Sequence, residues 1–210
     1  MIVEYTYKTV KQEGSAEFTE RKSVFIGWAA PVHDEGGALD FIDRVRRRHP
    51  GAGHNAYAYI IREGNITRFS DAGEPSGTAG MPILNVLQKQ GLTNVCAVVT
   101  RYWGGIMLGA GGLVRAYSHA AKIGVEAAGV AVWESFTEFG VSCSYADYEK
   151  ILKYIKSEKV IVDGTLFEAD VKLSLAARHD NFDEYAREII NLTNARADIN
   201  KTGARYDFLD

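Results

Sequence analysis

The stretch RYWGGIMLGAGGLVRAYSHA, residues 101–120, decides how the first part of the chain is built. It continues an apolar run, residues 93–102, that predicts a buried strand, and it leads into an alanine-rich run, residues 112–128, that predicts a helix. Five of the 21 glycines lie at residues 104–112, where these two elements meet. Because glycine weakens regular elements by ~0.5–1 kcal/mol relative to alanine, this cluster indicates a loop with positive φ angles or a very close contact.

The glycine loop matches neither of the common phosphate-binding motifs. Gly104 and Gly109 have the spacing of a P-loop, but Ala110-Gly111 stands where that motif needs a lysine and a hydroxyl. A dinucleotide-binding motif could begin at Gly109, but Val114 occupies its third glycine position. The loop still predicts exposed N–H groups at a helix N-terminus, which favour a bound phosphate or carboxylate. The alternative is a tight packing corner between strand and helix.

Two arginines are expected to supply the positive field of this anion site. Arg101 ends the predicted strand and Arg115 lies one turn into the helix, so we expect both side chains to be exposed and to converge on the loop. We also expect Gly111 to have a positive φ or a close contact, so that Gly111→Val would strain the backbone. The predicted site comprises Arg101, Gly104, Gly105, Gly109, Gly111, Gly112 and Arg115.

The run DAGEPSGTAG, residues 71–80, is expected to be a second loop near this site. We include Asp71, Ser76 and His54 among the candidate anion-binding or nucleic-acid-binding residues. Asp71 and Ser76 more often hold such a loop through hydrogen bonds from their side chains to the backbone. Because neither the G-x-S-x-G, H-E-x-x-H nor C-x-x-C pattern is present, the sequence predicts no catalytic residue, no metal site and no cofactor.

Aromatic residues lie close to both loops. Tyr57, Tyr59, Phe69, Tyr102 and Trp103 could offer stacking faces to nucleic-acid bases. Aromatic residues at strand positions usually fill cores instead, and this alternative stays open.

The remaining residues up to position 133 predict a mixed α+β domain. A helix is expected from residue 38 until Pro50-Gly51 ends it. The other elements are two strands at residues 3–11 and 22–32 joined by a polar turn, a hairpin of residues 57–62 and 66–70, and a helix at residues 82–90.

From Glu134 the pattern becomes a regular βαββαβ alternation, which is typical of ferredoxin-like domains. Ser144 with Asp147 resembles a capping pair for the first helix of this part, and Asp180 is expected to cap the second. We therefore predict two domains, residues 1–133 and residues 134–210.

Composition and charge limit the classes of protein to which the chain can belong. It has 24 basic and 27 acidic residues, a net charge of −3, which argues against a uniformly basic binder of polyanions. The charge is uneven, with 14 basic and 12 acidic residues up to Trp133 (+2) and 10 and 15 from Glu134 onward (−5). The first domain is therefore the better candidate for an anionic partner.

Localisation is predicted from three features of the sequence. The sequence has neither an apolar run long enough to span a membrane nor a secretory signal, so we expect a cytoplasmic protein without a membrane partner. Cys96 and Cys143 lie in apolar runs and are expected to be buried free thiols.

The loop sequences resemble a known family. DAGEPSGTAGMPIL, residues 71–84, and residues 101–120 resemble the signature of the IMPACT/YigZ family of conserved bacterial proteins. KSVFIGWAAPV, residues 22–32, and HNAYAY, residues 54–59, also match, although the position of Trp103 is more usually phenylalanine. The resemblance implies an α+β fold: a ribosomal-protein-like sandwich, of the type found in domain IV of elongation factor G, followed by a ferredoxin-like domain similar to its domain V.

The resemblance implies a role in translation, because both expected domains are of types found in elongation factor G. We expect a non-catalytic protein whose first domain binds RNA, the ribosome or an acidic partner through the glycine loop. The alternative is a small-molecule enzyme that acts on a phosphorylated substrate, because glycine loops at helix starts also serve that purpose.

Overall fold

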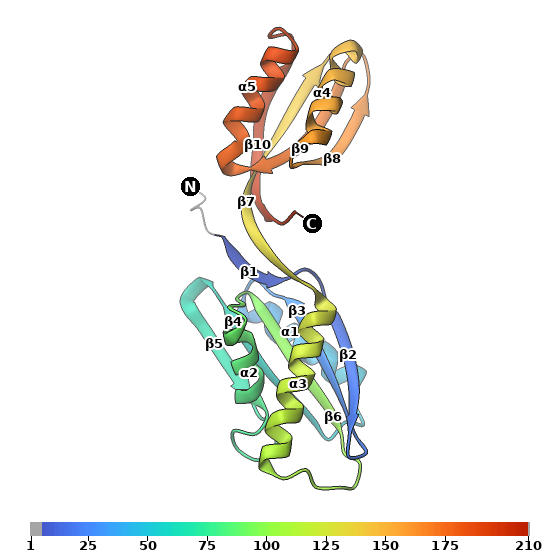
Figure 1. The fold of residues 1–210 in the computed structure, drawn as a ribbon, viewed down its shortest axis with the longest axis vertical. Coiled ribbons are helices and arrows are strands. Elements are labelled where there is room, and N and C mark those ends of the chain that lie inside the picture. Colours follow the sequence, from blue (N-terminus) through green and yellow to red (C-terminus); the bar gives the residue numbers. More distant parts are fainter. Residues whose placement is uncertain (1–5, 210) are drawn as a thin grey trace. The chain divides into compact units, whose positions relative to one another are not determined.

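The computed structural model describes residues 6–209. Within them the chain divides into two compact units, Tyr7–Val132 and a second unit that runs from Trp133 onward and includes Thr6. The described residues form two five-stranded sheets and five α-helices (Figure 1). The predicted α+β class with two domains is confirmed. No helix within residues 6–209 is both long enough and apolar enough to cross a membrane.

The first unit is built on an antiparallel sheet with the strand order β2-β3-β6-β4-β5. The strand β6 lies at its centre, and seven of its eight residues are buried. The strands are β2 (Gly14–Glu20), β3 (Ser23–Pro31), β4 (His54–Ile61), β5 (Ile66–Ser70) and β6 (Val95–Tyr102).

Helices cover both faces of this sheet. The helix α1 (Glu35–Arg48) packs Phe41 and Ile42 against one face, and Asp34 caps it by accepting a hydrogen bond from the Gly37 N–H at 2.7 Å. The helices α2 (Gly80–Lys89) and α3 (Ala110–Ala128) cover the other face. Figure 1 shows α3 lying along the sheet, with the loop before it at one end of the unit.

Two glycines let α3 lie very close to β3. A Cβ atom at Gly27 would stand 1.8 Å from the Ala120 carbonyl oxygen, and one at Gly124 would stand 2.7 Å from the Gly27 carbonyl carbon. Such distances are far inside van der Waals contact, so only glycine fits at both positions. This packing fixes where the first turn of α3 lies relative to β2 and β3.

The start of the chain differs from the prediction. A separate strand, β2, begins at Gly14, inside the predicted polar turn, and was not among the predicted strands. The strand β1 (Tyr7–Val10) is shorter than the predicted strand of residues 3–11, and residues 3–5 lie outside the described part. It neighbours β7 (Val130–Cys143), whose first residues belong to the same unit.

The second unit has the predicted βαββαβ order. Its strands follow the order β10-β7-β9-β8, the arrangement of a ferredoxin-like sheet, and the pairings are antiparallel. After β7 come α4 (Tyr145–Ser157), β8 (Val160–Phe167), β9 (Val171–Arg178), the short 3-10 helix η2 (His179–Asn181), α5 (Phe182–Leu192) and β10 (Asp198–Asp207). The first unit also contains a short 3-10 turn, η1 (Glu63–Asn65), which joins β4 to β5.

The two predicted helix caps of this unit had different outcomes. The Ser144 hydroxyl accepts a hydrogen bond from the Asp147 N–H at 3.2 Å, so the capping pair is confirmed. The expectation that Asp180 caps α5 is wrong, because η2 precedes that helix and Asn181 occupies the cap position without a side-chain hydrogen bond.

Both cysteines are buried free thiols, as predicted. Burial raises the pKa of the Cys96 thiol and also that of the Cys143 thiol.

Candidate anion-binding site

The loop before α2 is held by Asp71. Its Oδ1 accepts hydrogen bonds from the Ala79 and Gly80 N–H groups at 3.0 and 2.8 Å, and its Oδ2 accepts one from Gly77 N–H at 2.9 Å. Burial opposes ionisation of this carboxyl, but the three N–H donors hold its pKa below the usual value. Asp71 therefore has the loop-holding role, and its oxygens are occupied by backbone.

A second loop, residues 103–109, leads from β6 into α3. At Gly104 the chain passes so close to the turn between β2 and β3 that a Cβ atom would stand 2.0 Å from the Lys22 carbonyl carbon. The Gly104 N–H donates to the Ser23 hydroxyl at 3.1 Å. Gly105 and Gly109 have φ angles of 81° and 73°, which favour glycine. The predicted need for glycine is real at these three positions.

Gly111 does not behave as expected. It lies in the first turn of α3 without a positive φ, and a Cβ atom there would meet only Nη1 of Arg115, at 3.6 Å. The expectation of backbone strain at Gly111 is therefore wrong. The same distance shows that the Arg115 guanidinium folds back beside the first turn of its own helix.

Arg101 is buried, so the expectation of an exposed side chain at this position is wrong. It is 6% exposed, and its Nη1 donates to Oε1 of Glu74 at 2.7 Å. Tyr117 OH donates to the same oxygen at 2.7 Å, and burial followed by this bond raises the pKa of Tyr117. Since Arg101 lies on the central strand β6, Glu74 supplies the counter-charge that a buried guanidinium requires.

The first turn of α3 is the open end of the site. Gly109 occupies the cap position, and no side chain in the described part of the chain caps this helix. The Leu113 N–H bonds to the Gly109 carbonyl at 3.0 Å, so the N–H groups that precede it point away from the helix. A helix end of this kind carries about half a positive charge.

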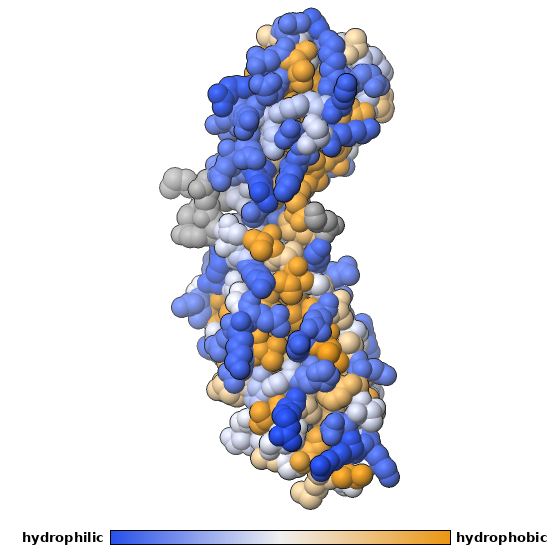
Figure 2. Space-filling view, in the orientation of Figure 1, coloured by the Kyte–Doolittle hydropathy of each residue, from blue (hydrophilic) through white to orange (hydrophobic). Residues whose placement is uncertain are grey.

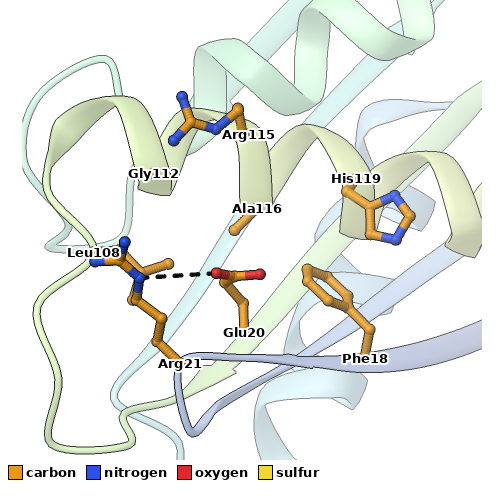
Figure 3. Close-up of a pocket in the computed structure, with 8 residues that line it drawn as sticks. All are labelled: Phe18, Glu20, Arg21, Leu108, Gly112, Arg115, Ala116 and His119. Atoms are coloured by element: carbon orange, nitrogen blue, oxygen red, sulfur yellow. Dashed lines mark ion pairs between the residues drawn. The ribbon is translucent and has the colours of Figure 1, made fainter.

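A hollow of about 250 Å³ opens beside this turn (Figure 3). Arg115 lines it from α3, and Arg21 lines it from the turn between β2 and β3. Figure 3 shows the guanidinium of Arg21 close to Leu108 and that of Arg115 turned toward the start of the helix. Glu20 is the acidic residue of the lining, and it lies 4.0 Å from Nε of Arg21 in an exposed ion pair. The complete lining is Phe18, Glu20, Arg21, Leu108, Gly112, Arg115, Ala116 and His119.

The other candidate residues do not join this hollow. Nδ1 of His54 donates to the Ala72 carbonyl at 2.9 Å, and its Nε2 lies 3.9 Å from Glu74, on the side of the buried ion pair. Ser76 is exposed, and no hydrogen bond of its side chain occurs within residues 6–209. Thus Gly112 and Arg115 line the hollow, while Arg101, His54 and Asp71 support the structure behind it.

Arg21 and Phe18 were missed because β2 was not predicted, and His119 of α3 was missed because nothing placed β2 beside that helix. Arg21 and Lys22 form the two-residue turn between β2 and β3, with φ angles of 44° and 65°. Two adjacent cations at a hairpin turn were the available signal. Within residues 6–209, no cluster of three or more His, Cys, Asp or Glu side chains could hold a metal ion.

Comparison with known proteins identifies the family. Residues 21–125 match the model of the Impact N-terminal domain, and residues 141–196 match a domain of unknown function, DUF1949. The chain is 36% identical over 203 residues to IMPACT family member YvyE of Bacillus subtilis, with 96% of this chain and 94% of that protein covered. The chain belongs to the IMPACT family.

Other relatives agree with this assignment. IMPACT family member YigZ of Escherichia coli is 38% identical over 128 residues, with 60% of this chain and 63% of that protein covered. A solved structure, described as the crystal structure of a hypothetical protein, has a TM-score of 0.60 and 27% identity over 94% of this chain and 97% of that one. Arg21 and Arg115 both lie inside the region that matches the Impact N-terminal domain.

Proposed function

We propose that this member of the IMPACT family is a non-catalytic, translation-associated protein whose first unit binds RNA through the phosphates. The observation that carries the proposal is the placement of Arg21 and Arg115 on either side of the uncapped first turn of α3. The link to translation comes from the resemblance of its sequence signature to that of the family.

The electrostatics of the hollow favour a phosphate. Two exposed guanidinium groups and the positive end of a 19-residue helix face one space, against the single carboxylate of Glu20. Arginine pairs with phosphate through two parallel N–H donors, and backbone N–H groups at a helix start add further donors. A phosphate oxygen can therefore replace the weak, exposed contact between Glu20 and Arg21.

The turn between β2 and β3 supports a binding role for its two cations. A two-residue hairpin turn in which both residues have positive φ prefers Asn-Gly, because side chains on other residues are strained there. Arg21 and Lys22 occupy these positions instead. Strained backbone of this kind is enriched at binding sites, where the function of the side chains offsets its cost.

The surface beyond the hollow suits a polymer better than a single small molecule. The solvent-facing side of α3 continues from Arg115 to His119 and Lys122, and Lys89 of α2 lines the adjoining groove. Successive phosphates of a nucleic acid could contact Arg115, Lys122 and Lys89 along this side, with Lys122 exchanging its exposed ion pair to Glu126 for a phosphate. Glu74, the nearest buried carboxylate, is held by Arg101 and Tyr117, so it is poorly placed to act as a general base.

The experiment is a titration of labelled structured RNA and of purified ribosomes against the whole protein over a salt series. The proposal predicts modest affinity that falls steeply as salt rises, because phosphate contacts release counterions. Absence of binding, or saturable binding that does not respond to salt, would overturn it.

The alternative enzyme role uses the same phosphate position and is tested by a second measurement. If the protein is an enzyme, a thermal-shift screen of nucleotides and phosphorylated metabolites should find one compound that clearly raises the melting temperature at millimolar concentration or below. A strong shift with one metabolite and no RNA binding would favour the enzyme.

A further inference from the structure

A second hollow, of about 380 Å³, lies on the other side of the start of α3. Its apolar lining comes from Trp103, Met107 and Leu108 of the loop and from Leu113 of α3. Leu108 also lines the first hollow, the one that contains Arg21 and Arg115 and is here called the cationic hollow. Ala110, in the first turn of α3, lines the second hollow. The two spaces therefore meet at the same helix end, where one has two exposed guanidinium groups and the other has an aromatic wall.

The apolar side chains of this second hollow are unusually accessible. Trp103 is 65% exposed and Met107 is 84% exposed. Figure 2 shows hydrophobic and hydrophilic surface side by side at the end of the first unit that carries this loop. Covering an exposed indole with a flat apolar surface is favourable, because it removes apolar area from water.

The floor of this hollow does not favour a second anion. Glu74 and Arg101 line it, but they neutralise each other at 2.7 Å. An uncharged, planar group therefore suits the space better than another phosphate, whereas the neighbouring hollow suits a phosphate. A nucleotide joins one group of each kind through a single sugar.

We propose that this hollow binds an unstacked base of single-stranded RNA against Trp103 while the adjoining phosphate lies at the start of α3. The inference rests on the proposed function and names the form of RNA that the site takes. Stacking of a base on an aromatic side chain tolerates any base, so the site selects single strands over duplexes without reading sequence. Duplex RNA keeps its bases stacked and offers the phosphates alone.

The test compares three probes on the whole protein: a short single-stranded oligoadenylate, a duplex RNA of the same length, and inorganic polyphosphate. The single strand should quench tryptophan fluorescence and bind more tightly than the duplex, whereas polyphosphate should bind without quenching. Trp103→Ala should weaken the single strand roughly 5- to 150-fold and leave polyphosphate unchanged. Trp103→Phe should keep the affinity, because a ring remains, but lose the quenching.

Each outcome decides between the two claims. Equal affinity of Trp103→Ala and the wild type for the single strand, or equal quenching by the duplex, overturns the base site. Binding of polyphosphate without any quenching by the oligoadenylate also overturns it, and leaves the apolar surface to a protein partner. If neither RNA nor polyphosphate binds the wild type, the proposed function itself is wrong. Because Trp103 is largely exposed, its variants should melt at the wild-type temperature, which guards against a folding artefact.

Discussion

Nη1 of Arg101 lies 2.7 Å from Oε1 of Glu74, and this buried ion pair joins the central strand β6 to the loop that begins at Asp71. Glu74 is 8% exposed and Arg101 is 6% exposed. Tyr117 of α3 binds the same carboxylate oxygen. The contact therefore ties together three segments that support the start of α3, without offering a free charge to a ligand.

Removing one partner of this pair should destabilise the protein. Arg101→Ala leaves the Glu74 carboxylate buried without its cation, which should cost about 3–5 kcal/mol of the unfolding free energy. Denaturant unfolding checks this, with Arg47→Ala as the control, because Arg47 is exposed on α1 and its loss should change stability by less than about 0.5 kcal/mol. If Arg101→Ala kept full stability and lost RNA binding, Arg101 would be a ligand residue.

Two glycines of the same loop region should respond in opposite ways to alanine. Gly104→Ala puts a Cβ atom into the Lys22 backbone, so we expect a loss of about 1–3 kcal/mol or more. Gly111→Ala should be neutral or stabilising by up to about 1 kcal/mol, because its position is helical and open. Melting temperatures of the two variants check the pair. Equal destabilisation by both would mean that the loop packs differently.

The turn between β2 and β3 should show a conflict between stability and binding. The double change Arg21→Asn with Lys22→Gly installs the residues that this turn prefers, so we expect stability to rise by about 1 kcal/mol or more. The same change removes two cations, so RNA affinity should fall. Thermal unfolding and RNA titration of this one variant measure both effects. Unchanged affinity would exclude the turn from the binding site.

The second unit should lose stability in acid through Asp147. Hydrogen bonds from Arg196 at 2.8 and 3.0 Å, and then from Lys150, hold the pKa of this carboxyl well below 3.8. Because the folded-state pKa is lowered, the contribution is complete above the unfolded-state pKa and is lost as the pH falls through the folded-state value. The stability difference between wild type and Asp147→Asn should be constant from pH 7 to about 4 and shrink below it. A difference that shrank already between pH 7 and 5 would contradict this assignment.

The order of strand, glycine loop and helix was predictable because it depends on local signals. The buried run of β6, the glycines at positions 104, 105 and 109, and the alanines of α3 each specify their own conformation. The second unit was predictable for the same reason, since its apolar periodicity alternates regularly between strand and helix.

The cationic hollow was only partly predictable because β2 carries weak signals. Its sequence, GSAEFTE, contains residues with low strand propensity, and its turn lacks the Asn-Gly pair that marks such hairpins. Without β2, Arg21 could not be placed opposite Arg115. The burial of Arg101 depends on Glu74 and Tyr117, which are distant in sequence, so no local pattern revealed it.

The most direct measurement of the central claim is the salt dependence of single-stranded RNA binding by wild type, Arg115→Ala and Arg47→Ala. Arg47 lies on α1, which covers the opposite face of the sheet from α3, so it is a matched arginine outside the site. We predict that Arg115→Ala lowers affinity by about 1.5–3 kcal/mol, reduces the slope of log affinity against log salt by about 0.7, and leaves the melting temperature unchanged. Arg47→Ala should match the wild type in all three. Identical affinities and slopes for Arg115→Ala and Arg47→Ala would contradict an anion site at the start of α3.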